Sequence, residues 1–150
     1  MTPRYAWENI VDYIPKGVVL WEAFYGDGTS ATHLQSLGFD VVSEDIDFFE
    51  HDLGDIIVTN PPFSIAKTII PRLKELDKPF ILIMPVSKMC TGYVRESFKD
   101  TLQIIIPPKR IHFIKHVNGV VPKGWDSSCS FDCFYYCYKI NLPRDIVWLE

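Results

Sequence analysis

The sequence predicts an α/β protein with a mostly parallel sheet and helices on both faces. Short apolar runs alternate with helix-like stretches, and the runs are continuous rather than alternating, as in strands that are buried on both faces. The chain of 150 residues has the length of one domain, so we expect a single domain over residues 1–150. With 47% hydrophobic and 23% charged residues, the composition excludes an intrinsically disordered or fibrous protein.

Each expected element rests on a local pattern. Apolar runs rich in β-branched and aromatic residues predict strands over 18–21, 39–42, 55–59, 80–84, 102–106 and 110–115, and a last strand over 131–140. Helical spacing predicts a helix over 29–37, with Gly38 as its C-terminal glycine, and a second over 64–76 that Pro71 breaks or kinks. Even spacing on the last strand puts three cysteines on one face and favours packing over metal binding; these are Cys129, Cys133 and Cys137.

The charge is divided unevenly along the chain. The formal net charge is -4, but residues 1–60 carry two basic and eleven acidic side chains, and residues 61–125 carry eleven basic and four acidic ones. The overall acidity therefore does not exclude a nucleic-acid partner, provided that the basic side chains gather on one face. Four cysteines, no apolar run approaching about 18 residues and no signal-peptide pattern predict an intracellular, reduced protein without a membrane span.

A glycine-rich turn is expected between the first strand and the first helix. It reads Glu22-Ala23-Phe24-Tyr25-Gly26-Asp27-Gly28. Glycines let the backbone approach a ligand closely, and the helix N-terminus supplies free N–H groups. Ala31 stands where a dinucleotide fingerprint has its third glycine, which the relaxed form of that fingerprint allows, so a dinucleotide site remains possible here.

Carboxylates follow the second expected strand, in Glu44-Asp45-Ile46-Asp47-Phe48-Phe49. A carboxylate at the end of that strand is placed to accept hydrogen bonds from ribose hydroxyls. Taken alone, the same segment also fits a solvated acidic loop.

The tetrapeptide Asn60-Pro61-Pro62-Phe63 follows the third expected strand and is the most specific motif in the chain. The prolines rigidify the backbone and push the preceding asparagine into an extended conformation. The Asn60 amide oxygen and the Pro61 carbonyl can each accept a hydrogen bond from a planar amine, while the Phe63 ring offers a stacking surface for a flat base. Together these groups suit an exocyclic –NH₂ and its ring.

With these motifs in this order, the chain resembles the amino-methyltransferases that depend on S-adenosylmethionine, in particular small N6-adenine methyltransferases of viral and phage type. The resemblance implies a Rossmann-like class I methyltransferase fold with three layers and seven strands, one of them antiparallel near the edge. It also implies a catalytic role for Asn60, Pro61, Pro62 and Phe63, and S-adenosyl-L-methionine as cofactor. The cofactor-binding residues that it implies are Thr2, Pro3, Glu22, Phe24, Gly26, Gly28, Asp45, Ile46, Asp47 and Phe48. The acidic loop is shorter than in other members, so Asp45, Asp47 and Asp52 could exchange roles.

The implied reaction is methyl transfer to the N6 amine of adenine in DNA, with RNA as the less favoured substrate and no metal. One alternative is methylation of a protein glutamine amide, and another is a degenerate module that binds the cofactor without turnover. A nucleotide-cofactor oxidoreductase would leave the Asn60–Phe63 motif unexplained. Phosphate contacts are expected from Lys67, Lys109, Arg110 and Lys123, with the stretch 107–110 on the same rim as Asn60. Target recognition is left to residues 85–128, a homodimer or a partner subunit.

The tryptophans divide into two groups. Trp7, Trp21 and Trp148 are expected in the core, whereas Trp125, beside Lys123 in a loop rich in glycine and proline, could stack on a base.

Overall fold

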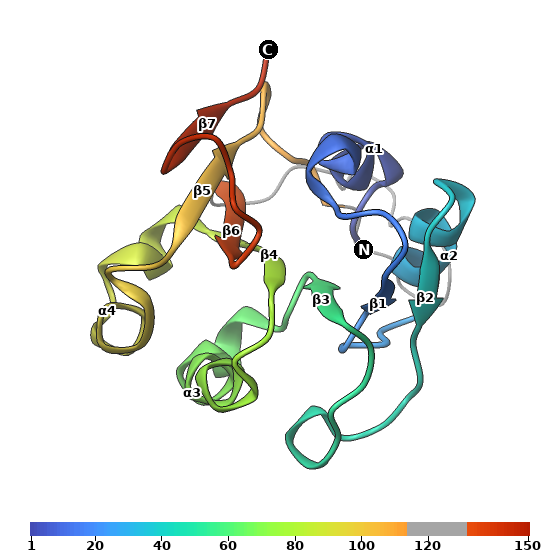
Figure 1. Cartoon of the computed structure of the whole chain (residues 1–150), viewed down its shortest axis with the longest axis horizontal. Helices are drawn as coiled ribbons and strands as arrows, with labels where there is room; N and C mark the ends of the chain where they lie inside the picture. Colours follow the sequence, from blue (N-terminus) through green and yellow to red (C-terminus); the bar gives the residue numbers. More distant parts are fainter. Residues whose placement is uncertain (114–131) are drawn as a thin grey trace, which may run out of the picture.

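A computed structural model describes residues 1–113 and 132–150. The predictions made for Lys123, Trp125 and Cys129 lie outside these residues. In the part of the chain that is described, seven strands form one sheet in the order β2-β1-β3-β4-β6-β5-β7 (Figure 1). Their bounds are β1 Val19–Trp21, β2 Asp40–Val42, β3 Ile56–Thr59, β4 Phe80–Pro85, β5 Gln103–Ile106, β6 Cys133–Tyr138 and β7 Ile146–Trp148.

The sheet is parallel except at β6, which is antiparallel to both of its neighbours, β4 and β5. All other neighbouring strands pair in parallel. The predicted mostly parallel sheet with one antiparallel strand towards an edge is therefore confirmed. Because β5 runs in the same direction as β1, β3 and β4, the segments that follow these strands all leave from the same edge of the sheet, which we call the carboxyl edge.

Helices cover both faces of the sheet. The α-helices are α1 Arg4–Glu8, α2 Thr29–Ser36, α3 Ala66–Leu76 and α4 Gly92–Phe98, and short 3₁₀ helices are η1 Val11–Tyr13, η2 Phe48–Glu50, η3 Phe63–Ile65 and η4 Val86–Cys90. Figure 1 shows α1 and α2 on one side of the sheet and α3 and α4 on the other. This is the three-layer arrangement of a Rossmann-like fold.

The core consists of two apolar clusters, one on each face. Alternate strand residues such as Val58 and Ile81 pack with α1 and α2, where Trp7 is fully buried. Their sequence neighbours, such as Ile57 and Leu82, pack with α3 and α4. All four residues of β3 and all six of β4 are buried, as expected of central parallel strands. Trp21 is buried as predicted, and Cys133 and Cys137 lie in the α1–α2 cluster as packing residues.

The end of α2 matches its sequence signal, whereas the proline in α3 does not act as predicted. After α2, the N–H of Gly38 donates to the Gln35 carbonyl at 3.0 Å and the N–H of Phe39 donates to the Leu34 carbonyl at 3.3 Å. Gly38 has a φ of 98°, so this is a Schellman motif, and the predicted C-terminal glycine is confirmed. The prediction for Pro71 is wrong in part, because α3 continues through it from Ala66 to Leu76 with Pro71 on the exposed side.

Three other predictions are corrected by the structure. Residues 110–113 form no strand: the N–H of His112 donates to the Tyr5 hydroxyl at 2.7 Å instead of to a neighbouring strand. The strand over 131–140 is not the last, because β7 follows it. Strand β7 was missed although residues 146–149 form a short apolar run, as long as the run over 18–21; only Val147 of the three strand residues is buried. Trp148 is therefore not a core residue but is 72% exposed at this sheet edge.

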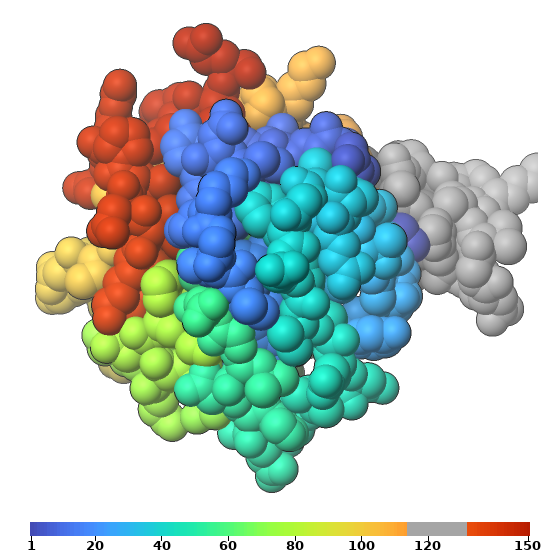
Figure 2. Space-filling view, turned by 45° about the vertical axis from the view of Figure 1, so that its right-hand side comes forward, coloured from blue at the N-terminus to red at the C-terminus, as the bar shows by residue number. Residues whose placement is uncertain are grey.

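The N-terminal segment that contains α1 is held against β6 of the sheet by hydrogen bonds. The Tyr135 hydroxyl on β6 donates to the Ala6 carbonyl, and the Asn9 amide donates to the Tyr135 hydroxyl at 3.3 Å. In Figure 2 the N-terminal segment, in blue, lies between the C-terminal strands in red and the cyan segment around β2. Among the described residues, no helix combines the length and the apolar character needed to cross a membrane.

Candidate functional site

A pocket of about 510 Å³ opens at the carboxyl edge of the sheet. It lies where the strand order reverses between β1 and β3, which is where ligands bind in open α/β sheets. The three predicted segments meet in it: the glycine-rich turn after β1, the acidic segment after β2 and the tetrapeptide after β3. Its lining residues are Ala23, Phe24, Tyr25, Gly26, Asp45, Ile46, Asn60, Pro61, Pro62 and Phe63.

The glycine-rich turn relies on two left-handed glycines. Gly26 and Gly28 have φ values of 58° and 82°, and the N–H of Gly28 donates to the Tyr25 carbonyl at 2.9 Å. A Cβ on Gly28 would lie 3.2 Å from the hydroxyl oxygen of the exposed Tyr25 side chain, which would have to shift, and the positive φ itself favours glycine there. Gly26 lines the pocket, whereas Gly28 starts α2 behind it. Hydrogen bonds from Thr29 hold the pKa of Asp27 below its ordinary value.

Glu22 is a buried carboxyl group directly after β1, and only 2% of it is exposed. Its Oε1 accepts from the Phe24 N–H at 3.1 Å and from the Thr59 hydroxyl. Burial raises the pKa of Glu22 to about 8, despite these two hydrogen bonds, which lower it. Without a ligand, Glu22 is therefore mainly protonated at neutral pH. It lies behind the pocket wall formed by Ala23 and Phe24.

Two residues of the acidic segment line the pocket, and the two that follow them lie behind its wall. Asp45 and Ile46 line the pocket, whereas Asp47 and Phe48 do not. Asp47 caps η2, because its Oδ1 accepts from the Phe49 N–H at 2.8 Å. Phe48 is buried with its ring centroid 4.9 Å from that of Phe24, so it supports the pocket wall from behind.

The tetrapeptide places an amide in the pocket wall. Asn60 Nδ2 donates to Thr2 Oγ1 at 2.7 Å, and Asn60 Oδ1 is buried with no hydrogen-bond partner among the described residues. Pro61 is buried and Pro62 is exposed, and Phe63, which begins η3, packs partly against both apolar clusters. Thr2 is 3% exposed and contacts the lining residue Asn60, but neither Thr2 nor Pro3, which precedes α1, lines the pocket itself.

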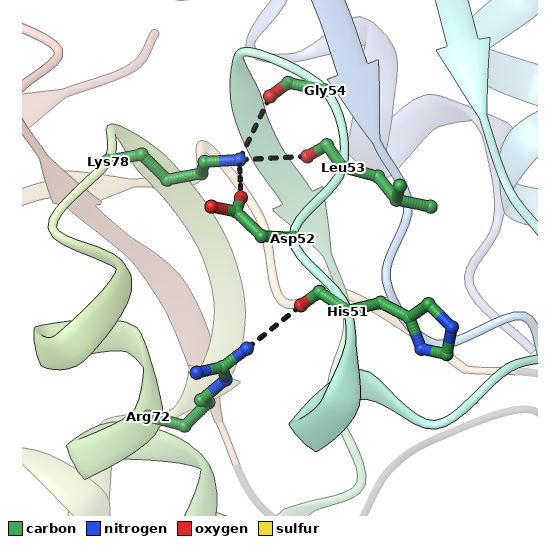
Figure 3. A network of polar contacts seen from close by, with 6 residues as sticks. All are labelled: His51, Asp52, Leu53, Gly54, Arg72 and Lys78. Carbon is green, nitrogen blue, oxygen red and sulfur yellow. Dashed lines mark hydrogen bonds and ion pairs between the residues drawn. The ribbon is translucent and has the colours of Figure 1, made fainter.

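The turn between the acidic segment and β3 is tied to the region of α3 (Figure 3). Lys78 Nζ donates to the carbonyl oxygens of Leu53 and Gly54, both at 2.9 Å, and forms an ion pair with Asp52. Arg72 Nη2 donates to the His51 carbonyl at 3.0 Å. Asp52 is thus engaged with Lys78 and does not line the pocket. Of the three carboxylates that could have exchanged roles, only Asp45 lies in the pocket wall.

We expect Lys78→Met to lower the free energy of unfolding by about 1–3 kcal/mol, because two carbonyl groups and a carboxylate lose a donor whose side chain is only 15% exposed. Urea unfolding followed by circular dichroism measures this change. Lys67→Met, at an exposed position of α3, is the matched control and should change the free energy by less than about 0.5 kcal/mol. An equal, small effect of both variants would contradict the role assigned to Lys78.

The predicted basic residues lie at different distances from the pocket lining. Lys67 is exposed in the first turn of α3, four residues after Phe63. Lys109 and Arg110 follow β5 and are exposed at the carboxyl edge, as expected, but neither lines the pocket. Arg110 Nε also pairs with Asp132 Oδ1 at 3.2 Å.

Sequence reasoning missed two groups of residues. Thr59, the buried partner of Glu22, directly precedes the tetrapeptide, so its position beside the motif was the available signal. Arg72 and Lys78 carried no such signal, because more than twenty residues separate each of them from its partner in the turn. Within residues 1–113 and 132–150, no three His, Cys, Asp or Glu side chains gather as a metal site would require.

The fold and the pocket together define a class. The chain is an α/β protein with a Rossmann-like fold, and its pocket lies at the carboxyl edge between β1 and β3. No family model matches the chain.

One curated relative is the type II methyltransferase M.EcoRI of Escherichia coli. It is 31% identical over 88 residues, which cover 56% of this chain but only 24% of the relative, so the chain matches about a quarter of that protein. Two solved structures are also similar. TehB from Haemophilus influenzae has a TM-score of 0.49 at 14% identity, over 87% of this chain and 61% of TehB. A putative class I S-adenosylmethionine-dependent methyltransferase from Listeria monocytogenes has a TM-score of 0.49 at 12% identity, over 99% of this chain and 64% of that protein.

Proposed function

We propose that residues 1–150 act as one methyltransferase domain that uses S-adenosyl-L-methionine to methylate the N6 amine of adenine in DNA. The observation that carries this proposal is the buried, unpartnered Asn60 Oδ1 in a pocket wall shared with the glycine-rich turn and Asp45. The partial similarity to a type II methyltransferase supports the reaction class.

The pocket residues fit such a cofactor. A volume of about 510 Å³ is within the range of small-molecule sites. The backbone at Gly26 allows close approach of a ligand, Asp45 offers a carboxylate to ribose hydroxyls, and Phe24 and Ile46 supply apolar walls. When bound, S-adenosylmethionine supplies a methyl group made electrophilic by its positively charged sulfur. A positive charge bound near Glu22, which directly precedes the lining residue Ala23, favours the ionised form of its carboxyl group.

The tetrapeptide acts on the nucleophile. The exocyclic amine of adenine is a poor nucleophile, because its lone pair is delocalised into the ring. Hydrogen bonds from that amine to Asn60 Oδ1 and to the Pro61 carbonyl favour a more tetrahedral nitrogen with a localised lone pair. Phe63 offers its ring to the base. The work of these residues is therefore positioning and electrostatic stabilisation.

A base inside a duplex must leave the stack to reach this pocket. The phosphates on either side are then held by cations at the carboxyl edge, namely by Lys67 and Lys109, and by Arg110 in exchange for its ion pair with Asp132. Lys123 is proposed for the same role on the basis of the sequence.

Label transfer tests the proposal. The protein is incubated with S-adenosylmethionine carrying a tritiated methyl group and with DNA, RNA and protein fractions in separate reactions. Label in DNA supports the proposal, and label in RNA alone would show that the substrate is RNA rather than DNA. Label in protein alone would favour glutamine-amide methylation, because a glutamine side chain presents the same planar –NH₂ to Asn60. Binding of NAD instead of S-adenosylmethionine would favour the oxidoreductase.

Charge reversal at Lys109 tests the phosphate contacts. We expect Lys109→Glu to weaken binding to DNA of every sequence and to lower the slope of log K against log salt by about 1. Fluorescence anisotropy at several salt concentrations measures both changes. Lys99→Glu is the control, because this exposed lysine lies between α4 and β5, at the opposite edge of the sheet. Equal effects of the two variants would place the phosphate contacts elsewhere.

A further inference from the structure

The outer edge of β7 has no neighbouring strand in the described part of the chain. β7 is the last strand of the sheet and pairs with β5 on its inner side (Figure 1). The Asp145 carbonyl and the Leu149 N–H both bond to β5, at 2.8 and 3.0 Å. Because backbone groups alternate in direction along a strand, the N–H and C=O groups of Ile146 and Trp148 face the open edge.

This edge also exposes two large apolar side chains. Ile146 is 50% exposed and Trp148 is 72% exposed. They pair in register with Ile104 and Ile106 of the α3–α4 cluster and so lie on that face of the sheet, whereas Val147 between them is buried on the other face. Proteins usually protect an edge strand with lysine or proline, and residues 145–149 contain neither. An apolar edge of this kind is suited to pairing with another strand.

Charges of opposite sign stand at the two ends of this face. Continued in both directions, the alternation that puts Ile146 and Trp148 on one face adds Arg144 and Glu150, which are both exposed. Within residues 1–113 and 132–150, neither of them forms an ion pair. An extended strand puts about 20 Å between their Cα atoms, so they cannot meet within one chain. The order along this face is therefore positive, apolar, apolar, negative.

Such a face is complementary to a copy of itself related by a two-fold axis. When two β7 strands pair antiparallel with Val147 opposite its counterpart, each Ile146 lies opposite a Trp148 and each Arg144 lies opposite a Glu150. In this register, the outward N–H and C=O groups of Ile146 and Trp148 are the ones that exchange hydrogen bonds between the copies. Apolar pairs and opposite charges across two strands both stabilise antiparallel pairing. The two-fold axis closes the assembly as a dimer.

We propose that β7 is a homodimer interface: two copies of the chain join their sheets edge to edge through antiparallel β7 strands, in the register centred on Val147. A nucleic acid fits this face less well, because Asp145 and Glu150 would both repel its phosphates. The inference is independent of the proposed methyl transfer, since β7 lies at the end of the sheet and the pocket lies between β1 and β3. Two short strands make a small contact, so we expect a Kd on the order of 10–100 µM.

Sedimentation equilibrium of the whole chain, from about 5 to 500 µM, measures the dimerisation. Trp148→Lys should raise the Kd at least tenfold, because it replaces an apolar cross-strand contact with the charge that protects edge strands. Met89→Lys is the matched control, since Met89 is another exposed apolar residue and lies in η4, and it should leave the Kd unchanged. A monomeric wild type over the whole range, or equal weakening by the two variants, would overturn the proposal.

A charge swap tests the register. Arg144→Glu and Glu150→Arg should each weaken dimerisation several-fold, because each of them puts like charges opposite one another across the axis. The variant that carries both changes restores opposite charges and should regain most of the lost affinity. An effect of net charge alone would move the two single variants in opposite directions. Two weakened single variants without rescue in the double variant would contradict the register and overturn the proposal.

The remaining outcomes also decide between the alternatives. A dimer that Trp148→Lys leaves intact would place the interface elsewhere and overturn the proposal. A monomeric wild type whose Trp148→Ala variant loses affinity for DNA would overturn it as well and make this face a nucleic-acid surface. Circular dichroism shows whether each variant is folded, and should Trp148→Lys not fold, the charge swap decides. A failure of the proposed methyl transfer would leave the prediction for β7 unchanged.

Discussion

Asn60→Ala is expected to abolish methyl transfer, with a loss of kcat on the order of 10²–10³-fold or more. The variant removes the one buried acceptor oxygen that has no partner in the described structure, and with it the hydrogen bond that localises the amine lone pair. The prolines and Phe63 remain, so the pocket keeps most of its shape. Affinity for the cofactor should be nearly unchanged, because the glycine-rich turn and Asp45 are untouched.

Single-turnover label transfer measures the chemical step, and calorimetric titration with S-adenosylmethionine measures the affinity. Gln35→Ala removes an amide from the exposed side of α2 and is the control, with no expected effect on either quantity. Parallel losses of turnover and cofactor affinity in Asn60→Ala would show that Asn60 holds the cofactor or the fold rather than the amine.

Glu22 is expected to make the stability of the free protein fall as pH rises. The folded-state pKa is about 8, above the value of 4.5 for an unperturbed carboxyl, so between these pH values the folded state retains a proton that the unfolded state has lost. The free energy of unfolding then decreases by about 1.4 kcal/mol per pH unit from this group, and the decrease ends as pH passes the folded pKa. The stabilisation is therefore fully present below pH 4.5 and is lost towards pH 8.

Glu22→Gln should remove this slope, because glutamine keeps the shape and the acceptor oxygen without titrating. Urea unfolding at a series of pH values between 5 and 8.5 tests the prediction, with Glu96→Gln on the exposed side of α4 as the control. The same slope in the wild type and in Glu22→Gln would contradict the raised pKa. In the wild type, saturating S-adenosylmethionine should reduce the slope if cofactor binding ionises Glu22.

The sequence was sufficient where one local pattern determined the structure. The continuous apolar runs at 55–59 and 80–84 predicted buried strands, which the structure has at 56–59 and 80–85, and Gly38 ended α2 because no other residue type adopts its φ so readily. The three segments of the pocket were also predictable, since each directly follows a strand and parallel strands bring these ends to one edge.

Other features depended on contacts between distant parts of the chain. Nothing in the local sequence indicated that Asp52 would pair with Lys78, which removed it from the pocket and left Asp45 there. The hydrogen bond between Thr2 and Asn60 likewise arises only when α1 packs beside β6. Strand β7, by contrast, had a local signal in the apolar run 146–149, and its place at the sheet edge with only Val147 buried became visible in the structure.

Nucleoside analysis tests the central claim most directly. Unmethylated DNA is incubated with the protein and S-adenosylmethionine with a labelled methyl group, digested to nucleosides and separated by chromatography. The proposed function predicts that the label elutes with N6-methyldeoxyadenosine, and that none does so when Asn60→Ala replaces the wild type. Label on another nucleoside, or none in DNA from a wild-type protein that binds S-adenosylmethionine, would contradict it.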